Sequence, residues 1–196
     1  MKRLFTFLAV LALAAMPATA LAQSNAYGWS LSASPTDPFV NQAPLVPGVA
    51  TVTLWYVCAD LPPDFEPDGM SAAEFDVVGT NPANVFLSAS ALVPFLNAGA
   101  GNNLLLAVGG CPQGPLPAVS VLTLMNADGG WNLAPSSITG VKGTVDCTTA
   151  PVIWDIDWIG CFFGSTGQPD GKGTPPFCEP VSVEESSWGT IKGLYR

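Results

Sequence analysis

Proline and glycine recur so often along this chain that no long helix fits between them. Its 196 residues include 19 Pro and 20 Gly, and both residue types weaken or break a helix. We therefore expect few and short helices. Short apolar runs recur instead, at residues 27–33, 49–58, 73–78, 85–89, 104–108, 118–125, 138–145 and 152–163.

Turn-forming sequences such as Pro62-Pro63 and Asp128-Gly129-Gly130 separate these runs. Regular short strands between such turns predict an all-β fold: an immunoglobulin-like or jelly-roll β-sandwich of about eight or nine strands, with a barrel as the alternative. Residues 49–57 are apolar at both alternating sets of positions. That pattern predicts either a central strand covered on both faces or a strand that belongs to an interface.

The N-terminal residues MKRLFTFLAVLALAAMPATALAQ have the organisation of a secretory signal peptide. Lys2 and Arg3 precede an apolar run, and small residues follow it, which predicts cleavage after Ala22 or, alternatively, after Ala20. The apolar run is too short to span a bilayer as a helix. We expect a signal peptide at 1–22, a β-sandwich domain at 23–180, a C-terminal tail at 181–196, and an extracellular or cell-surface location.

The part that follows this leader is strongly acidic. Four Lys/Arg against 15 Asp/Glu leave it a net charge of −11, so both nucleic acid and anionic lipid would repel it. These two classes of partner are set aside, and a protein or a polysaccharide at the cell surface remains. Charged residues make up only 11% of the chain and apolar residues 48%, which favours a folded domain over disorder.

Five cysteines suggest disulfides, because an exported chain meets an oxidising environment. Cys58 ends one strand-like run and Cys111 follows another, so a bridge between neighbouring strands makes Cys58–Cys111 the preferred pair. Cys161 and Cys178 could staple the long loop at 162–180. Cys147 completes the set, so one thiol must be left over, and a buried unpaired cysteine is the alternative for any one of the five.

The middle of the chain resembles a known family. GMSAAEFDVVGTNPANV, NLLLAVGGCPQGP and PAVSVLTLMNADGG follow the strand rhythm of cohesin-like bacterial β-sandwiches, in which a strand carrying "AEF" precedes a central strand and a strand ending in a polar turn. The resemblance covers roughly residues 49–137. It implies a jelly-roll sandwich that serves adhesion or assembly.

Most catalytic chemistry has no residues to perform it. The chain contains no histidine, which removes Ser-His-Asp and Cys-His arrangements, His-containing zinc sites and the usual general base. The sequence contains no nucleophile elbow, phosphate loop or dinucleotide fingerprint. We therefore expect a protein that is not an enzyme.

Two carboxylates in IWDIDWIG keep a glycosidase in consideration. On one strand, Asp155 and Asp157 would share a face, while Trp154 and Trp158 would share the other. Paired acids at that spacing approach the geometry of an inverting glycosidase. The simpler interpretation is a strand whose acids face water and whose tryptophans enter the core. Exposed tryptophans would instead form a platform for stacking on sugars.

A second acidic group lies in DFEPDGMSAAEF. Asp64, Glu66 and Asp68 occupy positions 1, 3 and 5 of a calcium-loop pattern, but position 12 is Phe75, where the bidentate acid belongs. An ordinary acidic turn is the simpler interpretation. Calcium is accordingly the only cofactor that we consider.

The chain ends in SVEESSWGTIKGLYR, which is basic and aromatic. The candidate interaction residues there are Trp188, Ile191, Lys192, Tyr195 and Arg196. The ending resembles an "SWGxIKxLYR" type of C-terminal tail on otherwise different secreted bacterial proteins. It is interpreted either as a segment packed onto the sandwich, as an address read by export or anchoring machinery, or as a contact to an acidic subunit.

The leading hypothesis is a secreted, non-enzymatic bacterial structural or interaction module. A carbohydrate-binding module that uses exposed tryptophans is the alternative, and a carboxylate-only glycosidase is the third. Exposure of Trp154 and Trp158 distinguishes the first two, because buried rings cannot stack on a sugar.

Overall fold

Strands and their connections make up the part of the chain that the computed structural model describes, which is residues 27–59, 69–147 and 149–164. No helix occurs in these ranges. Thirteen strands occur in them, against the eight or nine expected, because the structure adds several strands of two to four residues. The strands are β1 Tyr27–Ser32, β2 Gln42–Ala43, β3 Gly48–Ala59, β4 Met70–Gly79, β5 Val85–Ala91, β6 Phe95–Asn97, β7 Asn103–Val108, β8 Leu116–Met125, β9 Gly129–Ala134, β10 Gly143–Asp146, β11 Ile153–Trp154, β12 Ile156–Ile159 and β13 Cys161–Phe163.

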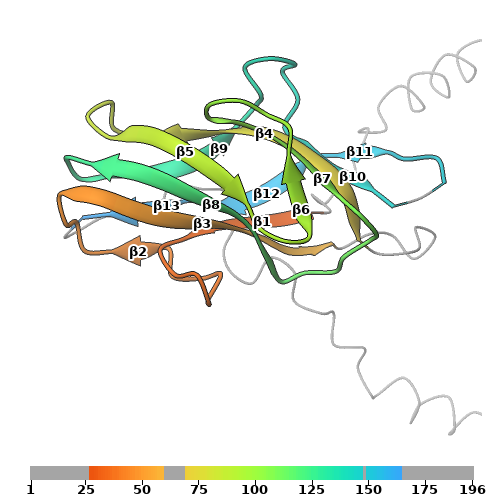
Figure 1. Cartoon of the computed structure of the whole chain (residues 1–196), viewed down its shortest axis with the longest axis horizontal. Helices are drawn as coiled ribbons and strands as arrows, with labels where there is room; N and C mark the ends of the chain where they lie inside the picture. The colour runs from red at the N-terminus through yellow and green to blue at the C-terminus, as the bar shows by residue number, and fades with distance from the viewer. Residues whose placement is uncertain (1–26, 60–68, 148, 165–196) are drawn as a thin grey trace, which may run out of the picture.

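The strands form two sheets that pack face to face (Figure 1). Sheet A has five strands in the order β12-β1-β3-β8-β5. Sheet B has eight, with a path β11-β10-β4-β9-β13-β2, while β7 pairs with β4 and β6 pairs with β7. The expected all-β sandwich is therefore confirmed. The buried side chains on the inner faces of the two sheets form one contiguous core between them.

Aromatic side chains fill that core and link the sheets. Trp29 of β1 is fully buried, and its ring lies edge-on to Phe75 of β4 with 5.0 Å between centroids. The indole of Trp29 also donates to the hydroxyl of Thr144 at 3.0 Å, so its one polar atom is satisfied inside the core. Burying each large ring contributes on the order of 2–3 kcal/mol.

Strand β9 was missed in the sequence, where Gly129 and Gly130 were interpreted as a turn. The structure places both glycines in the strand, because its neighbours approach too closely for a side chain. A Cβ on Gly130 would lie 2.7 Å from the carbonyl oxygen of Cys161, and one on Gly129 would lie 2.9 Å from the amide nitrogen of Asn84. Glycine here permits backbone approach and does not form the turn.

The last two predicted runs are divided differently in the structure. Most of 138–145 is a connection, and only β10 at its end is a strand. The run 152–163 is three strands: β11 and β13 belong to sheet B, whereas β12 belongs to sheet A. The chain crosses from one sheet to the other at Asp155.

Candidate functional site

A loop at residues 33–41 covers half of the outer face of sheet A. Ser32 of β1 points outward, yet it is buried because its hydroxyl donates to the carbonyl of Asp37 in the loop at 2.6 Å. Trp55 of β3 is buried beneath the same loop, and its indole donates to the carbonyl of Ser34 at 3.3 Å. The loop therefore covers Ser32 and Trp55 from solvent.

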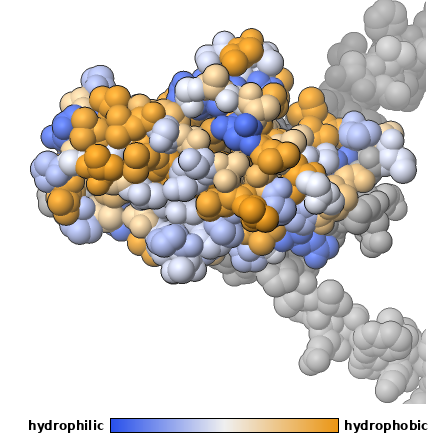
Figure 2. Space-filling model, viewed as in Figure 1, coloured by the Kyte–Doolittle hydropathy of each residue, from blue (hydrophilic) through white to orange (hydrophobic). Residues whose placement is uncertain are grey.

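The other half of the face is open and apolar. We call it the open face, and it consists of Val49, Val85, Leu87, Leu122 and Leu124. Val49 of β3 and Val85 of β5 lie on either side of Leu124 of β8. Exposed fractions are 64% for Val49, 46% for Leu87, 44% for Val85 and 36% for Leu122. Figure 2 shows apolar side chains gathered over β5 and β8 in this region.

Charged side chains are missing from this face. Strands β1, β3, β5 and β8 contain no Asp, Glu, Lys or Arg, and the only charged residue on a sheet A strand is Asp157, on β12 at the far edge. Between the apolar positions, Thr51, Ser88 and Ser90 supply only hydroxyls. An exposed sheet normally carries charges that keep it soluble and unpaired. Contiguous exposed apolar surface of this kind marks interaction sites.

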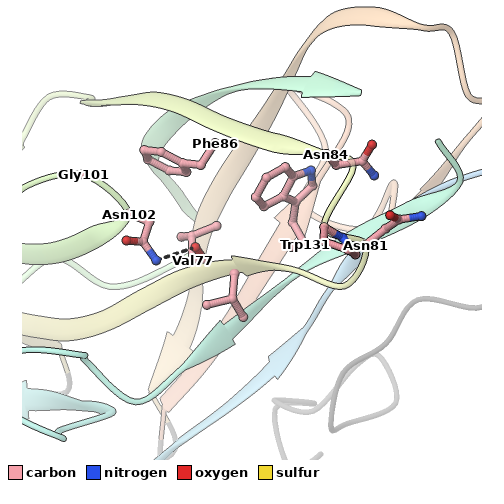
Figure 3. Close-up of a pocket in the computed structure, with 10 residues that line it drawn as sticks. Val77, Asn81, Asn84, Phe86, Gly101, Asn102 and Trp131 are labelled. Carbon is pink, nitrogen blue, oxygen red and sulfur yellow. Dashed lines mark hydrogen bonds between the residues drawn. The ribbon is translucent and has the colours of Figure 1, made fainter. Parts of the chain in front are cut away.

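A hollow of about 430 Å³ opens between the sheets beside β5 (Figure 3). The rings of Phe86 on β5 and Trp131 on β9 line it, 6.5 Å apart between centroids. Val77 and Gly79 of β4 line the opposite side. The hollow thus gives solvent access to the edge of the aromatic core.

Three asparagine amides, and no charged residue, complete the lining of the hollow. Asn102 donates to the carbonyl of Val77 at 3.2 Å. Asn81 donates to the carbonyl of Asp128 at 2.8 Å, and Asn84 donates to the carbonyl of Ala127 in the same turn at 2.9 Å. The amides therefore hold the loops around the hollow, which suits an uncharged group better than an ion.

Carboxylates gather on the outer face of sheet B instead. Asp76 is buried, and accepts from the amide of Asn103 at 2.9 Å and from the backbone N–H of Ser137 at 3.1 Å. Glu74 accepts from the hydroxyls of Ser136 and Thr139 at 2.7 and 2.8 Å. These acids tie the loop between β9 and β10 to β4, and both carboxylate oxygens of Asp76 accept hydrogen bonds from the chain.

A metal site finds no support in the described part of the chain, where no three His, Cys, Asp or Glu side chains are grouped to hold an ion. The calcium candidates Asp64, Glu66 and Asp68 lie outside the described residues. The same is true of the tail candidates, which are Trp188, Ile191, Lys192, Tyr195 and Arg196.

The paired-acid arrangement at Asp155 and Asp157 is wrong. Asp155 lies where the chain leaves sheet B, and Asp157 lies on β12 of sheet A, so the two acids do not share one strand face. Asp155 is exposed, and its carboxylate lies 3.7 Å from the ammonium of Lys142.

The exposed tryptophan platform is wrong as well. Trp154 is buried and donates to the carboxylate of Asp146 at 2.9 Å. Trp158 is half-buried, packs against the core, and carries the ammonium of Lys142 4.0 Å from its ring centroid. The simpler interpretation of this segment, with the tryptophans turned toward the core, is the one that the structure confirms.

Both expected disulfides need correction. Cys111 pairs with Cys147, not with Cys58, and their Cα atoms are 5.9 Å apart. The reason is topological: β7 and β10 both run antiparallel to β4 and end beside its first residues, and the bonded cysteines follow these two strands. Cys58 is also disulfide-bonded. Cys161, expected to pair with Cys178, is a free thiol because β13 turns it into the core.

Burial controls the chemistry of that thiol. Removal from water raises the pKa of Cys161 from 9.0 to about 12, although a backbone hydrogen bond involving Ala33 lowers it in part. A thiol with so high a pKa is neutral and unreactive near neutral pH. Cys161 is a core residue and not a nucleophile.

Sequence reasoning missed the open face as a site, although a signal was present. The run 49–57 was interpreted as a strand either covered on both faces or part of an interface. In the structure the strand is covered at one end, where Trp55 lies under a loop, and open at the other, where Val49 is exposed. The absence of charged residues from the three runs that form β3, β5 and β8 could have predicted the open face from the sequence.

Comparisons with solved structures find cohesin modules. The seventh ScaB type I cohesin from Pseudobacteroides cellulosolvens gives a TM-score of 0.48 at 9% identity, covering 76% of this chain and 97% of its own. The sixth cohesin of scaffoldin B from Acetivibrio cellulolyticus, solved with a Cel5 dockerin mutant, gives 0.44 at 14% identity, covering 72% and 99%. The cohesin module of a family 33 glycoside hydrolase from Clostridium perfringens gives 0.42 at 9% identity, covering 68% and 98%.

These similarities concern the fold and carry no conclusion about function. No family model matches the sequence, and no curated protein matches it. In the described part of the chain, no helix is long and apolar enough to cross a membrane.

Proposed function

We propose that this protein is a secreted, non-enzymatic interaction module that docks another protein on the open face. One observation carries the proposal: three neighbouring strands of an acidic chain expose Val49, Val85, Leu87 and Leu122 with no charged residue among them. Such a surface costs solubility and adds nothing to the core, so a partner that covers it is the physical reason for it.

The chemistry of the open face favours protein over the other partner classes. It presents aliphatic side chains and hydroxyls, with no exposed aromatic ring on which a sugar would stack. It offers no cation to a phosphate, and the sequence beyond the leader is acidic. Aliphatic anchors with a hydroxyl rim suit the apolar patch of a protein surface.

Burial of these side chains supports a reversible contact. Completing the burial of each exposed aliphatic residue contributes on the order of 1 kcal/mol. Summed over the residues of the open face, this favourable free energy is comparable to the free-energy cost of immobilising two proteins relative to each other. We therefore expect stable docking to need further contacts beside the open face.

Support for secretion comes from the leader-like N-terminus, and support for a non-enzymatic role comes from the chain's lack of histidine. Three described carboxylates, those of Glu74, Asp76 and Asp146, accept hydrogen bonds from structural donors, which supports a structural role for these three acids.

Site-specific photo-crosslinking tests the proposal. A photoreactive amino acid replaces Thr51, which is exposed among the open-face residues, and a control chain carries it at Ala107, which is exposed on β7 of sheet B. Both chains are presented to the cell-surface and medium proteins of the producing bacterium. We expect one discrete adduct from position 51, absent from position 107 and lost when Leu122→Lys is added.

Equal crosslinking from both positions would contradict the proposal, because the contact would then be unrelated to the open face. Absence of any adduct from position 51, with intact protein present, would contradict it too. Secretion is tested separately by the mass of the mature chain, which should begin at Gln23.

A further inference from the structure

Strand β5 is the most open edge of the sandwich. It forms one end of sheet A, and no strand pairs with its outer side among the residues that the structure describes. The other outermost strands, β2, β6, β11 and β12, have only two to four residues, whereas β5 has seven. Its backbone therefore offers the longest row of N–H and C=O groups for pairing with another chain.

Two of the usual protections of an edge strand, proline and charge, are absent from β5, and a single β-bulge is present. Its sequence VFLSASA holds no proline and no charged residue, although natural sheets use both to prevent pairing at an edge. A bulge between Phe86 and Ser88 is its one irregularity. The edge strand at the opposite end of sheet A differs, because β12 carries Asp157 and has Lys142 and Asp155 nearby.

The hollow lies where an added strand would need it. A strand pairing with β5 would run about 4.8 Å beyond it, and its side chains would alternate between the two faces of sheet A. Those on the inner side would lie beside Phe86, which lines the hollow. Those on the outer side would continue the surface formed by Val85 and Leu87.

We propose that β5 accepts an extended peptide segment of a partner protein as a sixth strand of sheet A, with one apolar side chain of that segment inserted into the hollow against the rings of Phe86 and Trp131. Strand addition takes its affinity from main-chain hydrogen bonds and its selectivity from pockets for alternate side chains. This inference rests on the proposed docking function and supplies the further contacts that the open face requires.

The chemistry of the hollow identifies the occupant. A space of about 430 Å³ holds one side chain of leucine or phenylalanine size and the adjoining backbone. The aromatic and amide lining contains no charge, so the inserted side chain is apolar. The net charge of −11 beyond the leader disfavours an acidic segment. The partner segment is therefore extended, non-acidic and marked by a large apolar side chain.

A blocked peptide, acetyl-Thr-Val-Thr-Phe-Thr-Val-Thr-amide, is the probe for this site. Nuclear magnetic resonance spectra of the ¹⁵N-labelled full chain are recorded with up to 1 mM peptide. We expect shift changes at the amides of β5 and at Phe86 and Trp131, with slower hydrogen exchange along β5. A peptide N-methylated at alternate residues and a peptide with Asp in place of Phe should each bind at least tenfold more weakly.

Two glycine substitutions provide a matched pair. Gly79 lines the hollow, and a Cβ there would lie 3.4 Å from the ring of Trp131, so Gly79→Leu should fill the hollow and weaken peptide binding at least tenfold. Gly109 has open space around its Cβ position, so Gly109→Leu should leave binding unchanged. Neither glycine has a positive φ, and the backbone of each accepts leucine.

Several results would overturn the inference. These are unchanged amide chemical shifts along β5 at 1 mM peptide, an equal affinity for the N-methylated peptide, and an unchanged peptide affinity of the Gly79→Leu chain. Pairing of β5 with a second copy in the absence of peptide would assign the edge to self-association and overturn the choice of occupant. The Leu122→Lys chain separates the two proposals, because it should lose crosslinking at position 51 while retaining peptide binding along β5.

Discussion

The outer faces of the two sheets differ in the side chains that they cover and in those that they leave exposed. On sheet B, Glu74 and Asp76 are charged residues that the loop between β9 and β10 covers with hydrogen-bond donors. On sheet A, the strands β3 and β8 carry no charge and leave Val49 and Leu122 in contact with water. The carboxylates on sheet B accept hydrogen bonds within the fold, whereas the apolar side chains on sheet A remain exposed to water.

This difference separates structural residues from available ones. A buried carboxylate with all its hydrogen bonds made within the chain contributes to stability and has nothing left to offer a ligand. An exposed aliphatic residue gains the remaining part of its burial energy only when a partner covers it. The comparison therefore predicts that substitutions on sheet B change folding, whereas substitutions on the open face change binding.

The largest expected effect is on the alkylation rate of Cys161, which tests whether water and reagents are excluded from the core between the two sheets. Because burial raises the pKa of Cys161 to about 12, its thiolate fraction at pH 8 should be roughly 1,000-fold below that of an ordinary cysteine. Alkylation of the native chain by iodoacetamide, followed by mass mapping of the Cys161 peptide, should show a rate lower by about that factor. Rapid labelling of the native chain would mean that the core opens at β13.

The same thiol predicts a pH dependence of stability. Below pH about 9 the thiol is neutral in both the folded and the unfolded chain, and its stabilising contribution is complete. Between pH 9 and about 12 only the unfolded chain ionises, so the free energy of unfolding should fall across that interval. Urea titrations at several pH values should show a steeper fall for the wild type than for Cys161→Ala.

Asp76→Ala should produce the next largest effect. It removes the acceptor for Asn103 and for the N–H of Ser137, and we expect a loss of about 3 kcal/mol in the free energy of unfolding, measured by urea titration. Asp37→Ala removes an exposed carboxylate that accepts one backbone N–H and should cost at most about 1 kcal/mol. Equal losses from the two substitutions would remove the distinction between buried and exposed acids.

Leu122→Lys should weaken partner binding and leave folding stability nearly unchanged, which is the opposite of the result expected for Asp76→Ala. We expect about 30-fold weaker binding of the crosslinked partner, near 2 kcal/mol, with a change of no more than about 0.5 kcal/mol in unfolding because the site is exposed. Leu105→Lys is its matched control, since Leu105 is 41% exposed on sheet B against 36% for Leu122 on sheet A. Calorimetric titration should show normal affinity for Leu105→Lys; a similar loss would place the contact on both faces.

Lys142→Met should give the smallest effect. Lys142 is the single cation among the described residues, lying 3.7 Å from Asp155 and 4.0 Å from the ring centroid of Trp158. Because Asp155 is largely exposed, we expect a loss below about 1 kcal/mol in thermal unfolding. Unchanged partner affinity would keep this cluster separate from the open face, whereas reduced affinity would extend the binding surface toward β12.

Predictions from sequence succeeded where one strand could be recognised from its own residues. The runs at 27–33, 49–58 and 118–125 correspond to β1, β3 and β8, because alternating or continuous apolar residues bounded by turns identify a buried strand locally. They failed where the outcome depended on a distant neighbour. The Cys111–Cys147 pair is an example, because it depends on β7 and β10 both ending beside the first residues of β4.

The candidate site follows the same division. The charge-free composition of β5 and β8 is a property of the sequence, but the exposure of Leu122 and Val85 is not. Exposure depends on which half of sheet A the loop at 33–41 covers and on the position of β5 at the sheet edge. The hollow lined by Phe86 and Trp131 likewise joins residues from two sheets.

The sequence by itself determined the class of fold and excluded most chemistry. Frequent proline and glycine prevent long helices, apolar periodicity specifies strands, and a chain without histidine lacks the usual acid–base group, since all three are properties of residue type and local spacing. Tertiary structure alone decided which thiol stays reduced, which acids are satisfied and which apolar residues remain exposed. Those outcomes depend on sheet order and on loops that cross a face, and contacts between residues far apart in the chain determine both.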